Sequence, residues 1–78
     1  MPLIDEFLAN ELEPYVRGLL LRELEAKRPA YLRFNVFNVR LDPETDLVTL
    51  EDVLDPNRVE VIGLEVFRKL LDQRRSGR

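Results

Sequence analysis

The N-terminal third of the chain repeats apolar residues at helical spacing. Between positions 3 and 28 they recur at steps of three and four, which places them on one stripe of a helix. The stripe consists of Ile4, Phe7, Leu8, Leu12, Tyr15, Val16, Leu19, Leu20 and Leu24. Pro14 interrupts it, because proline lacks the N–H that would bond to residue 10 and its ring crowds that carbonyl. We expect either two helices, 3–12 and 14–28, or one helix kinked at Pro14, and in both cases an end at Pro29.

The next stretch, YLRFNVFNVR at 31–40, alternates polar and apolar residues with one fault in the pattern. As an unbroken strand it would mix both kinds of side chain on each face. A β-bulge at Val36–Phe37 would shift the phase by one residue and remove the fault. One face would then carry Leu32, Phe34, Val36, Phe37, Val39 and Leu41, and the other Tyr31, Arg33, Asn35, Asn38 and Arg40.

A reversal follows at 42–46, where the sequence DPETD has the Asp-Pro start of a tight turn. We therefore expect a β-hairpin with strands at about 31–41 and 46–51. On the apolar face Val48 and Leu50 would lie opposite Leu41 and Val39. On the polar face Thr49 and Glu51 would lie opposite Arg40 and Asn38.

The apolar residues of the C-terminal part again recur at steps of three and four, which favours a helix at about 56–73 that begins after Asp55. They are Val59, Ile62, Val66, Phe67, Leu70 and Leu71. The alternative is a third strand at about 58–66, because the valines, the isoleucine and Gly63 lower helix propensity. Residues 74–78 have no apolar anchor and are expected to form a frayed basic tail. The sequence thus predicts a single small α+β domain over residues 1–73.

The size of the domain favours association with another chain. A chain of 78 residues buries only about 60% of the surface that its unfolded form exposes. With no Cys, a disulfide cannot supplement the core. A lone hairpin also leaves both edges unpaired, and an unpaired edge invites another strand. We therefore expect a homodimer or a complex with a protein partner.

The residue types that are missing reduce the catalytic options. Without His or Cys there is no imidazole base and no thiol nucleophile, and Ser76 is the only serine. The same absences remove the commonest transition-metal ligands. We expect no enzyme activity, no cofactor and no metal.

These features predict a small non-catalytic protein-interaction module, such as an adaptor, an inhibitor or a regulatory subunit. The candidate interaction surface is the polar face of the hairpin, formed by Tyr31, Arg33, Asn35, Asn38, Arg40 and Glu51. The alternative is a nucleic-acid-associated regulator that uses the same arginines and asparagines with the basic C-terminus. A net charge of −3 and a single exposed aromatic residue on that face disfavour this alternative.

The start of the chain and its apolar runs predict a cytoplasmic protein. Met1 is followed by Pro2 and then by acids, unlike a signal peptide. The longest unbroken apolar run, Leu19 to Leu21, is too short to span a bilayer. No association with membranes is expected.

Overall fold

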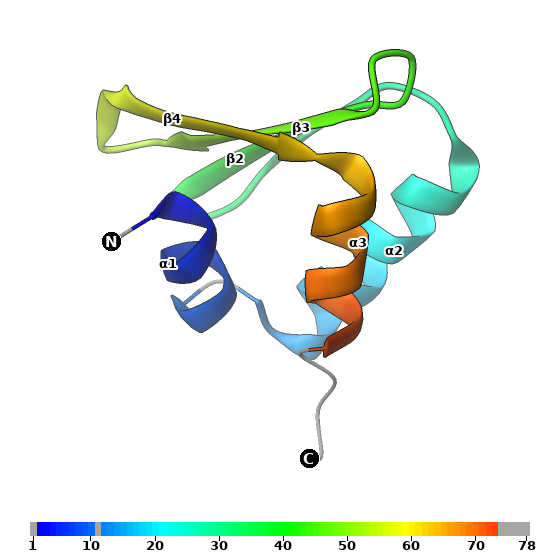
Figure 1. Ribbon diagram of the computed structural model, residues 1–78. Coiled ribbons are helices and arrows are strands. Elements are labelled where there is room, and N and C mark those ends of the chain that lie inside the picture. The colour runs from blue at the N-terminus through cyan, green and yellow to red at the C-terminus, as the bar shows by residue number, and fades with distance from the viewer. Residues whose placement is uncertain (1, 11, 74–78) are drawn as a thin grey trace.

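The computed structural model describes residues 2–10 and 12–73 and begins with two helices (Figure 1). Helix α1 spans Leu3–Asn10 and helix α2 spans Pro14–Ala26. Pro14 stands at the start of α2, where its missing N–H costs nothing, so the prediction of a helix divided at this proline is confirmed. Helix α2 is capped by Lys27, which adopts a left-handed conformation with φ of 56° and donates its N–H to the Leu24 carbonyl, so the helix ends before Pro29.

Four strands form one antiparallel sheet in the order β1-β2-β3-β4. They are β1 Ala30–Arg33, β2 Phe37–Asp42, β3 Leu47–Asp52 and β4 Asp55–Gly63. Helix α3, Leu64–Gln73, follows β4 directly. The α+β class is confirmed.

The predicted bulge at Val36–Phe37 is wrong, because the chain reverses there and makes a hairpin. The Phe34 N–H donates to the Phe37 carbonyl at 2.9 Å, and β1 pairs antiparallel with β2 so that Leu32 lies opposite Val39. The predicted separation of side chains nevertheless holds, since partners opposite each other in an antiparallel pair point to the same face. Phe37 and Val39 are buried, and Leu32 packs against the core with them.

The pairing of β2 with β3 follows the predicted register. Val48 lies opposite Leu41 and Leu50 opposite Val39, while Thr49 lies opposite Arg40 on the other face. Asp46, with φ of 59°, completes the turn between the two strands. The apolar pattern of the two segments was therefore sufficient to set their register.

The predicted helix over 56–73 is wrong in its first half, where the chain forms strand β4 up to Gly63. The alternative of a third strand at about 58–66 is closer, although α3 begins at Leu64. Val59 and Val61 favour extended backbone because they are β-branched, and β4 pairs with β3 from Val59 to Gly63. Residues 74–78, predicted to be a frayed tail, lie outside the described residues.

In the described part of the chain, the helices all lie on one side of the sheet (Figure 1). The core between them centres on Phe7 of α1, whose ring lies 5.7 Å from that of Phe37 and 6.2 Å from that of Phe67, between ring centroids. Phe7 and Phe67 are fully buried. The opposite face of the sheet carries no described helix and is called the open face below.

Candidate protein interface on the sheet and its edge

The open face brings together five of the six residues predicted to form an interaction surface. Cross-strand pairing places Tyr31 opposite Arg40, and Arg33 opposite Asn38. Asn38 in turn lies opposite Glu51. The sixth residue, Asn35, lies in the turn between β1 and β2 and is exposed.

These five residues form a cluster held together by its own contacts. The Tyr31 hydroxyl donates a hydrogen bond of 2.7 Å to Glu51 Oε1. The guanidinium carbons of Arg40 and Arg33 lie 4.7 and 5.5 Å from the centroid of the Tyr31 ring, within cation–π range. Arg40 Nη2 also lies 3.7 Å from Glu51 Oε2. The hydrogen bond with the Tyr31 hydroxyl holds the pKa of Glu51 below its ordinary value, and raises the pKa of Tyr31.

The contacts within this polar cluster occupy the groups that would otherwise bind a ligand. The Tyr31 ring already contacts two cations, and a carboxylate offsets part of their charge. A surface that binds single-stranded nucleic acid needs aromatic faces free for stacking and a net positive groove. The cluster instead ties β1, β2 and β3 together.

On β4 the open face becomes apolar. Val59 lies beside Glu51 and Val61 beside Thr49 in the register with β3. The side chains of Val59 and Val61 are 51% and 54% exposed. Sequence reasoning missed these two residues because it assigned 56–73 to a helix; the alternation in RVEVIG at 58–63 was the signal.

Strand β4 is an edge of the sheet, with no described strand beyond it. The Leu64 N–H donates to the Asp46 carbonyl on the β3 side at 2.9 Å. Backbone groups alternate along an antiparallel strand, so Val59 and Val61 direct their N–H and C=O groups away from β3, and Gly63 directs its N–H the same way. The Gly63 carbonyl precedes α3, at the position that accepts the first hydrogen bond of that helix. The first part of β4 is less suited to pairing, since its register with β3 shifts near Glu51/Asp52 and it contains Pro56.

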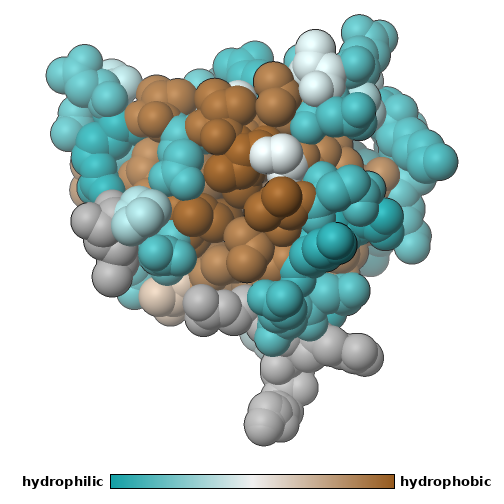
Figure 2. Space-filling model, viewed as in Figure 1, coloured by the Kyte–Doolittle hydropathy of each residue, from teal (hydrophilic) through white to brown (hydrophobic). Residues whose placement is uncertain are grey.

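The apolar surface continues from β4 onto the helices that flank it. Figure 2 shows hydrophobic residues gathered on the side of the molecule framed by α1, β4 and α3. Val66 of α3 is 54% exposed, and Ile4, Ile62 and Leu70 are partly buried against the core. We call this surface the apolar edge and define it as Ile4, Val59, Val61, Ile62, Val66 and Leu70.

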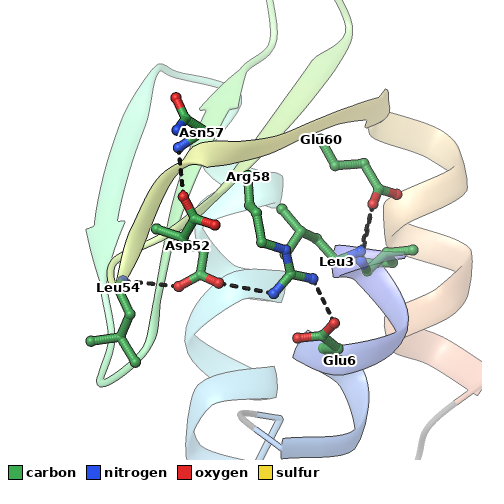
Figure 3. Close-up of polar contacts among 9 residues, drawn as sticks. Leu3, Glu6, Asp52, Leu54, Asn57, Arg58 and Glu60 are labelled. Atoms are coloured by element: carbon green, nitrogen blue, oxygen red, sulfur yellow. Dashed lines mark hydrogen bonds and ion pairs between the residues drawn. The ribbon is translucent and has the colours of Figure 1, made fainter. Parts of the chain in front are cut away.

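Charged side chains on the inner face of β4 fix it to α1 (Figure 3). Arg58 donates to Glu6 of α1 at 2.6 Å and to Asp52 of β3 at 3.1 Å. Asp52 is only 8% exposed, and its other oxygen accepts the Leu54 N–H at 2.9 Å. The hydrogen bond with Glu6 raises the pKa of Arg58. These contacts join the hairpin of β3 and β4 to α1.

A second inner-face contact, from Glu60, lies at the N-terminus of α1. Glu60 Oε1 accepts the N–H groups of Leu3 and Ile4 at 2.7 and 3.4 Å. Both amides lie in the first turn, where no intrahelical acceptor is available to them. The carboxylate therefore caps α1 from a strand far away in the sequence.

One depression in the described surface is lined largely by charged side chains. It encloses about 590 Å³ between the end of α2, the β2–β3 turn and the start of α3. Its polar lining consists of Glu25, Lys27, Glu44, Asp46, Glu65 and Arg68. Among the described residues no cluster of acidic side chains could hold a metal ion. No helix in residues 2–10 and 12–73 is long and apolar enough to cross a bilayer.

The fold defines a small α+β protein with an antiparallel meander covered on one face by helices. Compared with protein-family models, curated proteins and solved structures, the chain matches none of them.

Proposed function

We propose that this chain is a cytoplasmic, non-catalytic protein-interaction module that binds another protein through the apolar edge. It would act as an adaptor, an inhibitor or a regulatory subunit. The observation that carries the proposal is an edge strand that no described strand pairs with, and which exposes about half of the Val59 and Val61 side chains. Such an edge is normally blunted by charges or proline unless it pairs with another chain.

Two kinds of interaction are available at this edge to a protein partner. An added strand would accept and donate main-chain hydrogen bonds at Val59 and Val61 and accept one from the Gly63 N–H, which gives affinity with little dependence on partner sequence. Side chains of the partner could also cover Val66 and the partly buried apolar residues beside it. A nucleic acid would satisfy neither the apolar side chains nor the strand edge.

Site-specific photo-crosslinking in the cells that produce the protein tests this proposal. We would replace Val61 with benzoylphenylalanine in one variant and Arg22, exposed on α2, in the other. We expect protein adducts of discrete mass from position 61 and few from position 22. Equal yields from both positions would refute the apolar edge as the binding surface.

The nucleic-acid alternative has its own test at the polar cluster. Tyr31 already contacts Arg33 and Arg40, and Glu51 pairs with Arg40. We therefore expect the protein to cause no mobility shift of random oligonucleotides in gel electrophoresis, even at low salt. A shift that disappears in the double variant Arg33→Ala, Arg40→Ala would favour the alternative instead.

A further inference from the structure

We propose that the partner at the apolar edge is a second copy of this chain, whose β4 pairs antiparallel with β4 of the first on a two-fold axis at Val61. This inference rests on the proposed function and narrows it to one partner. It follows from the pairing geometry of β4 and from the charges on the two flanking helices.

The backbone of β4 allows few positions for such an axis. Val59 and Val61 are the residues of the regular stretch whose N–H and C=O groups both point outward, and Gly63 directs its N–H outward. An axis at Val61 gives each of them a partner: Val61 meets its own copy, and Val59 meets Gly63. The absence of a side chain on Gly63 leaves room for Val59 on the open face.

The neighbouring positions are less favourable. An axis at Glu60 would place the two copies of Glu60 directly opposite each other, and residues of like charge in such a pair destabilise it. An axis at Val59 would require pairing through residues 56–58, where Pro56 lies and the register with β3 is irregular. An axis at Ile62 would leave the outward groups of Val59 facing the other copy's helix α3.

The two-fold axis would also bring unlike helices together. Helix α1 is bound to β4 at Arg58 and Glu60, before the axis, and α3 begins after it, so α1 of each copy would lie beside α3 of the other. Helix α1 carries two acids and no base. Within the described residues neither Asp5 of α1 nor Lys69 of α3 makes an ion pair in its own chain.

The dimer would bury both the exposed backbone edge of β4 and the apolar side chains beside it. Ile4 of α1 and Val66 and Leu70 of α3 would face the other copy below the paired strands. Figure 2 shows a continuous apolar surface on this side of the molecule. The sheet would run through both copies. Only the short strand β1, with four residues, would remain as an edge at each end.

Single-cysteine variants test the axis, because the natural chain has no Cys. Partners in a hydrogen-bonded antiparallel pair have Cα atoms about 5.5 Å apart, which suits a disulfide. We expect Val61→Cys to form a disulfide-linked dimer under mild oxidation. Val59→Cys should not, since the two copies of that residue would lie about 13 Å apart. Leu54→Cys, in the exposed β3–β4 turn, is the matched control. Linkage at Val59 or Leu54 but not at Val61 would overturn the axis.

Sedimentation velocity tests the association itself. The natural chain should sediment as a dimer at micromolar concentration. Val61→Lys should raise the dissociation constant of the dimer at least tenfold, because it places two cations on the axis. Leu54→Lys should leave the dissociation constant unchanged. Circular dichroism should show both variants folded, since both side chains are exposed.

A natural chain that stays monomeric at hundreds of micromolar would overturn the second copy as partner. In that case, crosslinked adducts with a different protein at position 61 would still support the proposed function. A chain that stays monomeric and also gives no protein adducts at position 61 would refute the two proposals together.

Discussion

Glu60 provides the sharpest test of how the sheet stabilises α1. Its carboxylate accepts the Leu3 and Ile4 N–H groups, while the next two amides, of Asp5 and Glu6, donate to the Pro2 carbonyl. Replacing Glu60 with Ala removes the acceptor and leaves two amides of the first turn without a partner in the protein. Replacing it with Gln keeps an oxygen acceptor and removes only the charge.

The expected loss of stability can be scaled from known helix-capping effects. Removing an N-cap acceptor costs about 0.5–2 kcal/mol, and the interaction of a carboxylate with the helix dipole contributes about 0.3–1 kcal/mol. Because Glu60 is partly exposed, we expect Glu60→Ala to lower the free energy of unfolding by about 1.5 kcal/mol, and Glu60→Gln by about half as much. A domain of this size should lose roughly 4–8 °C of melting temperature per kcal/mol.

Urea unfolding followed by circular dichroism measures the loss, and amide hydrogen exchange locates it. Exchange should accelerate in α1 more than in β2 or β3. The control is Glu25→Ala, an exposed acid on α2, which should change stability by less than about 0.5 kcal/mol. The reasoning fails if Glu60→Ala matches this control, or if its exchange rates rise equally throughout the protein.

Two further predictions concern the core and the polar cluster. Phe7→Ala should lower the free energy of unfolding by about 3–5 kcal/mol in chemical denaturation, because Phe7 is fully buried among aromatic rings; a loss below about 1 kcal/mol would contradict its central place. The lowered pKa of Glu51 implies that its contact with Tyr31 stabilises the fold above the range in which an ordinary glutamate titrates, and that this stability is lost as pH falls through the lowered pKa. Tyr31→Phe should therefore raise the pKa of Glu51 in an NMR titration and weaken the acid dependence of stability, and an unchanged pKa would be evidence against the hydrogen bond.

Local patterns in the sequence were enough to predict much of the fold. The division at Pro14 depends on proline chemistry within one turn, and the pairing of Val39 with Leu50 depends on alternation in two adjacent segments. The prediction of a bulge near Val36 is wrong because a bulge and a tight reversal shift the alternation of side chains by the same one residue. Only the pairing of β1 with β2 distinguishes a reversal from a bulge, and the alternation of polar and apolar residues does not reveal that pairing.

The assignment of β4 depended on partners distant in the sequence. The apolar residues at 59, 62 and 66 fit a helix, and those at 59 and 61 fit a strand. Arg58 and Glu60 resolve the ambiguity by bonding to Glu6 and Leu3, 52 and 57 residues away. Sequence reasoning therefore placed the polar cluster on one face correctly but missed the apolar edge on β4.

The capping of α1 by Glu60 also affects the order in which the protein can fold. An eight-residue helix is unstable in isolation, so α1 needs tertiary contacts to persist. Its cap and its ion pair to Arg58 lie more than fifty residues later in the chain. On a ribosome, α1 leaves the exit tunnel well before β4 and must wait until β4 emerges. Closing a loop of that length slows folding, so the docking of α1 should be among the last steps, and its release among the first when the protein unfolds.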